Sequence, residues 1–199
     1  MESKEVNKEL AMSYDELVNY LLKKYGPAKY NYFSDLINNV KERRVTRTKE
    51  GLICHHIDED KAVMLSNHAH AIMNPPEYQE TSRLVYCNIL EHLILHIKIV
   101  EGPRNKLANK YSCLGLGGII NYICPQINDY YDGYIYKRQY QKNIFSKIKN
   151  NFDDYINVLK YFIDVIENKK PEHALLVTIE KLSEGWNSQV VERVYKQLI

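Results

Sequence analysis

Residues 83–99, with the sequence RLVYCNILEHLILHIKI, constrain the fold of this chain more than any other segment. A short run of strand-forming residues passes into an otherwise apolar helix in which His92 and His96 are four residues apart. This spacing places both imidazoles on one helical face, about 6 Å apart along the axis, where they can bind a single ion. The alternative is a pair of partly buried core histidines. The metalloprotease patterns HExxH and HxxEH are absent, because Leu93 follows His92 and Asn88 stands where the inverted pattern needs its first histidine.

A second histidine pair, His55 and His56, lies in residues 51–60, GLICHHIDED. Branched apolar residues around the pair favour a strand, and the acidic residues that follow favour a turn. Because residues 62–65 then resume an apolar run, the pattern predicts a β-hairpin. Successive side chains of a strand point to opposite faces, so we expect the two histidines to have different roles. The alternative is one histidine in the core and the other in solvent.

The rest of the chain predicts helices around this centre. Ser13 and Glu16 form a capping box before a helix that Gly26 and Pro27 end. Residues 29–49 give a mixed signal, and two prolines rule out a regular helix in residues 66–82, which we expect to form a loop. Further helices are expected at residues 117–130, 136–150, 152–168 and 171–182 and from residue 187 to the end.

The expected fold class is therefore α+β and mainly helical, with a central ββα unit flanked by N- and C-terminal helices. The expected division is an N-terminal helical and basic segment at residues 1–50, the central module at residues 51–100, and a C-terminal helical region at residues 101–199. A chain of 199 residues is long enough for one domain with a sizeable core, so we expect these parts to form one compact unit.

The positive charge of the chain is local, because the formal net charge is only +2. Residues 41–49 hold five basic residues against one acid, and residues 137–149 hold five against none. Such segments suit a polyanion such as nucleic acid, although a basic helix face is also common on solvated surfaces. The candidate nucleic-acid-binding residues are Lys41, Arg43, Arg44, Arg47, Lys49, Lys137 and Arg138.

The sequence gives no sign of secretion or of a membrane. Residues 1–10 lack the apolar core of a signal peptide, and no stretch approaches the roughly 18 apolar residues of a membrane span. The four cysteines form no CxxC pair, so neither a disulfide framework nor a zinc knuckle is indicated. We therefore expect a cytoplasmic location and no membrane partner.

The motifs CHHID, LVYCN and EHLILH together resemble the HNH endonuclease family, the ββα-metal nucleases. The resemblance covers about a quarter of the chain, residues 51–99. It implies that His55 is a metal ligand, that His56 is the general base, and that His92 and His96 are further ligands. It also implies one divalent ion, for which Mg²⁺, Mn²⁺, Zn²⁺ and Ni²⁺ are candidates.

The chain departs from the family pattern at the middle asparagine, which normally braces the loop that positions the base. Arg83 stands there and is the first candidate for this catalytic role. The alternatives, in the preceding loop, are Asn67, Asn74 and Gln79. Glu91 stands where many relatives have a zinc-binding cysteine. Asp58 is expected either to orient an imidazole or to face solvent.

The resemblance predicts a metal-dependent endonuclease that hydrolyses DNA phosphodiester bonds. General-base action by a histidine near neutral pH typically accelerates such a reaction roughly 100- to 10,000-fold. Two alternatives stay open, namely an inactive HNH-fold module that binds nucleic acid or protein, and a toxin that cleaves RNA. Family members occur in phages and mobile elements, among other settings.

Overall fold

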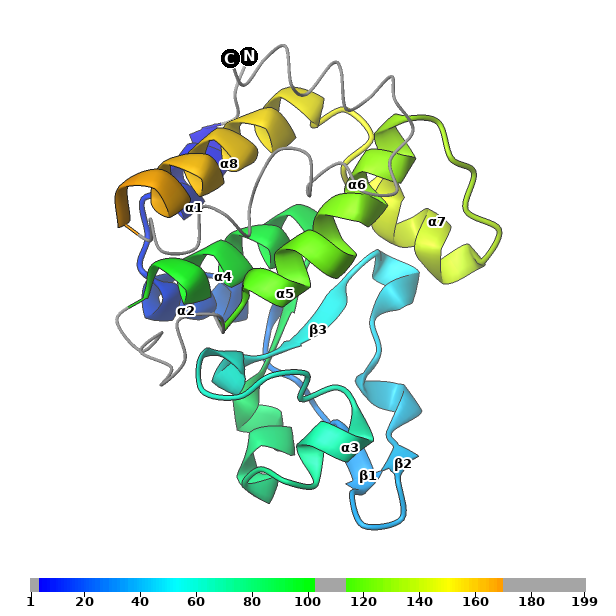
Figure 1. The fold of residues 1–199 in the computed structure, drawn as a ribbon. Coiled ribbons are helices and arrows are strands. Elements are labelled where there is room, and N and C mark those ends of the chain that lie inside the picture. Colours follow the sequence, from blue (N-terminus) through cyan, green and yellow to red (C-terminus); the bar gives the residue numbers. More distant parts are fainter. Residues whose placement is uncertain (1–3, 103–113, 170–199) are drawn as a thin grey trace.

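The computed structural model describes residues 4–102 and 114–169, which form a mainly helical α+β structure with two small sheets (Figure 1). The strands are β1 Phe33–Asp35, β2 Val40–Lys41, β3 Ile53–His56 and β4 Leu84–Cys87. The α-helices are α1 Lys4–Leu10, α2 Tyr14–Tyr25, α3 His68–Ala71, α4 Ile89–Glu101, α5 Leu116–Gly118, α6 Cys124–Tyr131, α7 Gln139–Ser146 and α8 Phe152–Asp164. Within these residues no helix has the length and apolar character needed to cross a membrane.

Strand β3 pairs antiparallel with β4, and the chain then enters α4. Ile53 lies opposite Cys87 and His56 lies opposite Leu84. The predicted hairpin with residues 62–65 is wrong. After His56 the chain forms the 3₁₀ turn Ile57–Asp60, and 27 residues lie between His56 and the partner strand. All four residues of β4 are buried, and this Leu-Val-Tyr-Cys run is a better strand former than Ala62 and its neighbours.

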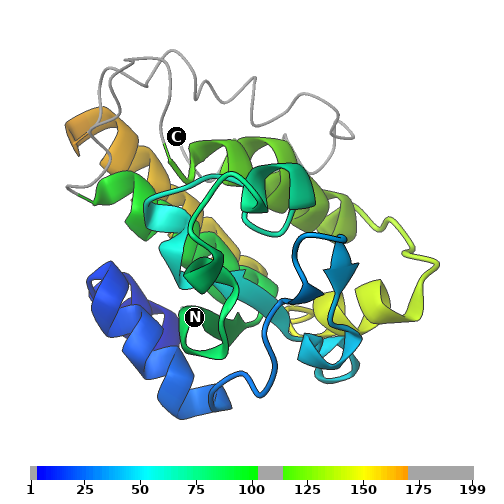
Figure 2. The same cartoon turned by 90° about the horizontal axis from the view of Figure 1, so that it is seen from below.

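Helix α4 is the centre of the molecule, because its sequence is apolar on nearly every face. It packs against α1, α2, α5 and α8, and α1 and α8 also contact each other (Figures 1 and 2). One continuous hydrophobic cluster runs from Val6 in α1 to Ile166 after α8 and includes α4. Asn88 caps α4 at its first turn, where its side chain accepts from the amides of Leu90 and Glu91. The beginning of α4 is thereby fixed directly after β4.

The other helix predictions are confirmed in most of the described residues. The Ser13–Glu16 capping box opens α2, and α5, a π-helical segment Ile119–Ile123 and α6 form the helix expected at residues 117–130. Helix α8 continues into a second π-helical segment, as far as residue 169. Helix α7 is shorter than the helix expected at residues 136–150. Tyr136 lies before its N-cap residue Arg138 and stacks its ring on Phe145 of α7. The helices expected at residues 171–182 and from residue 187 lie outside the described residues.

Residues 28–83 form a second, loop-rich part of the molecule below the helices in Figure 1. It contains β1, β2, the short helix α3 and several 3₁₀ turns. The expected loop at residues 66–82 carries α3 and two of these turns, Pro76–Gln79 and Thr81–Arg83. A small hydrophobic cluster joins this part to β4 and consists of Ala28, Val45, Leu52, Leu84 and Tyr86. The β3–β4 pair therefore lies between two cores.

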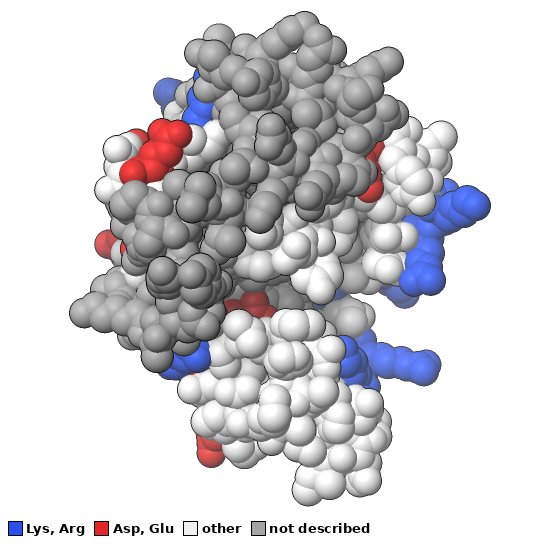
Figure 3. Space-filling view, in the orientation of Figure 1, with Lys and Arg blue, Asp and Glu red and all other residues white. Residues whose placement is uncertain are grey.

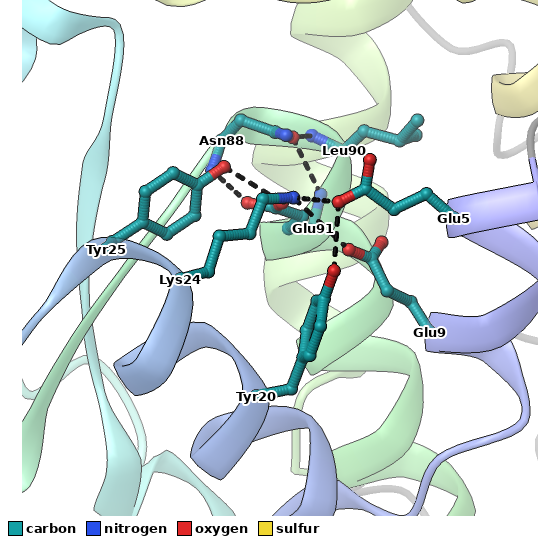
Figure 4. A network of polar contacts seen from close by, with 8 residues as sticks. All are labelled: Glu5, Glu9, Tyr20, Lys24, Tyr25, Asn88, Leu90 and Glu91. Carbon is teal, nitrogen blue, oxygen red and sulfur yellow. Dashed lines mark hydrogen bonds and ion pairs between the residues drawn. The ribbon is translucent and has the colours of Figure 1, made fainter.

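A carboxylate cluster holds α1 and α2 to the beginning of α4 (Figure 4). The ammonium of Lys24 contacts Glu91 at 2.7 Å, Glu9 at 3.7 Å and also Glu5. Glu91 in turn accepts from the backbone amide of Asn88 at 2.6 Å. The side chain of Glu9 is buried, and its Oε1 has no hydrogen-bond partner among the described residues.

Burial and the charge of Glu91 raise the pKa of Glu9 to about 8 from its ordinary 4.5. The folded state therefore favours neutral Glu9, a contribution that is complete below pH 4.5 and lost as the pH rises to about 8. We expect Glu9→Gln, which stays neutral, to match the wild type near pH 4.5. Between pH 4.5 and about 8, the free energy of unfolding of the variant should increase relative to that of the wild type by up to about 1.4 kcal/mol per pH unit. Urea unfolding of both proteins at a series of pH values measures the difference, and a constant difference would contradict the prediction.

Candidate metal centre

Three histidines and one glutamate converge between β3 and α4. His55, Glu59, His92 and His96 each offer one donor atom, and these four atoms all lie within 4.8 Å of one another. His55 comes from β3, Glu59 from the turn Ile57–Asp60, and His92 and His96 from one face of α4. The three histidines are those that the sequence predicted as ligands. Glu59 is an additional donor that the sequence analysis did not identify.

The separations of these donor atoms suit a single ion. Nε2 of His92 lies 3.2 Å from Nε2 of His96, which lies 3.4 Å from Oε2 of Glu59. Oε2 of Glu59 lies 3.6 Å from Nδ1 of His55. Ligands at about 2.0–2.1 Å from one ion, arranged tetrahedrally, are about 3.3 Å apart. The donor set therefore fits one divalent transition-metal ion.

The hydrogen bonds around His55 leave its Nδ1 with a lone pair. The hydroxyl of Tyr14 donates to the carbonyl of Ile57 at 2.8 Å, so its oxygen accepts from Nε2 of His55 at 3.0 Å. The ring hydrogen is then on Nε2. Nδ1 is buried and has no hydrogen-bond partner among the described residues. A buried imidazole nitrogen of this kind, facing a carboxylate and two further imidazoles, has the environment of a metal ligand.

His96 is oriented in a similar way. Its Nδ1 donates to the carbonyl of Gly115 at 3.2 Å, which leaves the lone pair of Nε2 directed at His92 and Glu59. The ring packs so closely on α5 that a Cβ at Gly118 would lie 2.6 Å from it. A Cβ at Gly115 would likewise lie 2.6 Å from the carbonyl oxygen of His96, so these two glycines of the GLGG sequence allow α5 to cover this ligand.

The electrostatics of the cluster favour the neutral imidazoles of His55 and His92, the form that metal binding requires. Burial lowers the pKa of His55 well below its ordinary value, and the neighbouring His92 and His96 add to the effect. The pKa of His92 is also lowered by burial and by His96. Protonation of these nitrogens therefore competes weakly with a cation for their lone pairs.

His56 points to the other side of β3, as the alternation of a strand predicts. The side-chain amide of Gln79 donates to the carbonyl of Leu65 at 3.2 Å, which directs its Oε1 at Nε2 of His56, 3.0 Å away. His56 therefore carries its hydrogen on Nε2 and a lone pair on Nδ1. Burial lowers the pKa of His56, and Tyr32 packs against its ring with the centroids 4.4 Å apart. Gln79 and Tyr32 thus hold this imidazole in one orientation, and burial favours its neutral form.

Four residues are candidates for the role of the family's middle asparagine, and Gln79 is the one of them that contacts His56. Arg83, the first candidate, instead forms a bidentate ion pair with Asp58, which also binds Lys61. Asp58 is fully buried, and among the described residues its carboxylate binds Arg83 and Lys61 and no imidazole, so both expectations for it are wrong. Arg83 therefore anchors the turn that carries Glu59. The other two alternatives bind locally, because Asn67 caps α3 and Asn74 donates to the carbonyl of His70.

The two basic segments lie side by side although they are far apart in the sequence. Asn143 of α7 donates to the carbonyl of Thr48 at 3.1 Å. A Cβ at Gly51 would lie only 2.5 Å from the carbonyl oxygen of Asn143, so the chains approach closely there. Figure 3 shows Lys and Arg side chains gathered at this edge, which we call the basic edge, formed by residues 41–49 and 137–149.

Only some of the candidate nucleic-acid-binding residues have a free cationic group. Arg44 pairs with Glu42, and Arg47 pairs with Glu50 and donates to the carbonyl of Tyr25. Lys41 donates to the carbonyl of Ser66 at 2.6 Å. The remaining candidates are exposed and make no side-chain hydrogen bond or ion pair with a described residue, and they are Arg43, Lys49, Lys137 and Arg138.

A second set of carboxylates, Glu5, Glu9 and Glu91, also brings its oxygens within 4.8 Å of one another. The ammonium of Lys24 lies among them and neutralises part of their charge, so the histidine cluster is the better candidate for a metal centre.

Comparison of the chain with models of known protein families, with curated proteins and with solved structures found no match.

Proposed function

We propose that this protein is a metal-dependent endonuclease that hydrolyses phosphodiester bonds of DNA. One observation carries the proposal. Three imidazoles and a carboxylate converge on a point suited to a divalent ion, and the residue next to one of them, His56, is a neutral imidazole oriented by Gln79. The resemblance of residues 51–99 to HNH endonucleases supports the same reaction.

His56 is the general base in this proposal. Its Nδ1 accepts a proton from the attacking water, while the Nε2 hydrogen bond to Gln79 keeps the ring in place. The imidazolium that results is stabilised by the negative charges of Glu59 and Asp58, both of which favour protonation of His56. The bound divalent ion would supply positive charge to a nonbridging phosphate oxygen and to the leaving oxygen.

The donor set favours particular ions. Imidazole nitrogens suit Zn²⁺ and Ni²⁺, whereas Mg²⁺ prefers oxygen ligands and keeps several waters. His55, His92 and His96 would hold the ion together with Glu59. We therefore propose Zn²⁺ or Ni²⁺ as the tighter-binding ions among the four candidates.

The test of this proposal is cleavage of supercoiled plasmid by purified protein, with the metal added or removed by EDTA. The proposal expects nicked or linear plasmid with the metal and intact plasmid with EDTA. Cleavage of RNA alone would favour the toxin alternative. Metal binding without cleavage of either nucleic acid would favour an inactive binding module.

Gln79→Ala is expected to lower the turnover on plasmid by roughly 10- to 100-fold with unchanged metal content, because the base loses its orienting contact. Arg83→Ala is the matched comparison. It removes the ion pair of buried Asp58, so it should lower the melting temperature more than Gln79→Ala does. Cleavage rates, metal content and melting temperatures of both variants are needed. A silent Gln79→Ala beside an inactive but stable Arg83→Ala would contradict the assignment.

Arg43→Ala and Lys49→Ala are expected to weaken DNA binding equally on every sequence, because free cations bind phosphates rather than bases. Each removed phosphate contact should reduce the slope of log affinity against log salt by about 0.9. Arg44→Ala is the control, because Glu42 already neutralises this side chain. Affinities measured at several salt concentrations test the basic edge, and equal losses for Arg43 and Arg44 would contradict its role.

A further inference from the structure

We propose that Glu59 is an exchangeable ligand of the metal centre. Its carboxylate binds the ion in the absence of substrate and leaves when a phosphate oxygen of the substrate takes its place. This inference rests on the proposed function, because it requires a metal at the histidine cluster and a phosphate-containing substrate.

The cluster offers one more protein donor than a catalytic zinc site uses. Structural zinc sites are closed by four protein ligands, whereas catalytic sites have three protein ligands and an open position. Here His55, His92, His96 and Glu59 supply four donors, which is enough to close the site. A phosphate oxygen needs a coordination position on the ion, so one protein donor has to dissociate from the ion.

Glu59 is the donor that lies on a short turn rather than on a strand or an α-helix, and no hydrogen bond within the described residues holds its carboxylate. His55 is held by the hydroxyl of Tyr14, and His96 is held by the carbonyl of Gly115. His92 projects from the packed helix α4. The carboxylate of Glu59, by contrast, contacts only the rings of His55 and His96 in the described part of the chain, and accepts no hydrogen bond there.

The position of Glu59 allows its side chain to move alone. The turn that carries it is fixed by the ion pairs of Asp58 with Arg83 and Lys61 and by the hydrogen bond from Tyr14 to the carbonyl of Ile57. The side chain of Glu59 is 14% exposed, whereas that of His55 is 0% and that of His96 is 9% exposed. A rotation about the side-chain bonds of Glu59 can therefore release the ion without any change in the backbone.

The exchange is balanced in charge. One bond between the ion and a carboxylate oxygen breaks, and one bond between the ion and an anionic phosphate oxygen forms. Each donor is a singly charged oxygen ligand, so the total charge of the centre stays the same. The carboxylate thus offsets one of the two positive charges of the ion until an anion of equal charge arrives.

The experiment uses the full chain loaded with Co²⁺, whose visible absorption reports its ligands, and inorganic phosphate as the probe. Glu59→Ala should keep Co²⁺ with a loss of affinity of no more than about tenfold, because three imidazoles remain. It should also bind phosphate at least about tenfold more tightly than the wild type, because the internal competitor is gone. Glu59→Gln, which is isosteric and neutral, should lie between the two proteins.

Glu77→Ala is the control for charge. Glu77 is exposed, and its side chain makes no hydrogen bond or ion pair with a described residue. Its replacement removes one negative charge away from the histidine cluster, so phosphate affinity should equal that of the wild type. Melting temperatures of all four proteins show whether each is folded.

Two results would overturn the exchange while leaving the metal centre intact. One is equal phosphate affinity in wild type and folded Glu59→Ala or Glu59→Gln. The other is a loss of Co²⁺ affinity of about 100-fold or more in both variants, which would make Glu59 a permanent ligand. A wild-type protein that binds no Co²⁺, Zn²⁺ or Ni²⁺ would instead refute the metal centre and the exchange together.

Discussion

His56→Ala is expected to lower the rate of plasmid cleavage by about 100-fold or more while leaving metal affinity close to that of the wild type. His56 is the one histidine of the β3 pair that lies outside the group of four donors, and its only side-chain hydrogen bond within the described residues goes to Gln79. Its removal therefore takes away the proposed base but no ligand. Cleavage rates and a calorimetric metal titration measure the two effects separately.

The comparison variant is His55→Ala, one residue earlier in the same strand. It removes a donor atom, so it should lower both metal affinity and cleavage, and excess metal should restore part of the cleavage. Added metal should not restore cleavage by His56→Ala. If the two variants had equal metal affinity, the division of roles between the two faces of β3 would be wrong.

The local parts of this structure are predictable from the sequence. The apolar run before and after Asn88 predicts a strand followed by a helix, and the i, i+4 spacing of His92 and His96 places both rings on one helical face. The alternation of β3 separates His55 from His56. Each of these inferences depends on the period of a single regular element.

The parts that the sequence did not determine depend on contacts between distant segments. The pairing of β3 with β4 is a tertiary contact. The apolar run at residues 62–65, which lies closer in sequence, was the wrong prediction for the partner strand. Tyr14 reaches His55 across 41 residues, and Gln79 reaches His56 across 23 residues of loop. Glu59 follows β3 in an irregular turn, so no helix or strand period relates it to His55. Its position among three acidic residues is equally typical of an exposed turn.

The contacts around the ligands connect the metal centre with the helices on both sides of it. Tyr14 begins α2 and binds His55, while Gly115 precedes α5 and binds His96. Donors from β3, the following turn and α4 converge only when these segments are packed together. Metal binding should therefore stabilise the folded chain as a whole, because the unfolded chain has no preformed site.

Metal removal is accordingly expected to lower the melting temperature of the wild type. An ion present at 100 times its dissociation constant stabilises the folded state by about 2.7 kcal/mol, which corresponds to several degrees in a chain of this size. His55→Ala and His96→Ala should lose most of this metal-dependent increase, because each lacks one donor. His56→Ala should retain it, as should His70→Ala, because His70 lies in α3 outside the cluster.

Thermal unfolding with EDTA and with added Zn²⁺ measures this increase for each protein. Core packing of the histidines makes a different prediction from metal binding. If the four residues His55, His56, His92 and His96 only fill the core, their alanine variants would all melt at lower temperature and EDTA would change nothing. A metal-dependent increase that is lost in His55→Ala and His96→Ala but kept in His56→Ala requires an ion bound at the cluster, because no packing effect distinguishes neighbouring buried histidines in this way.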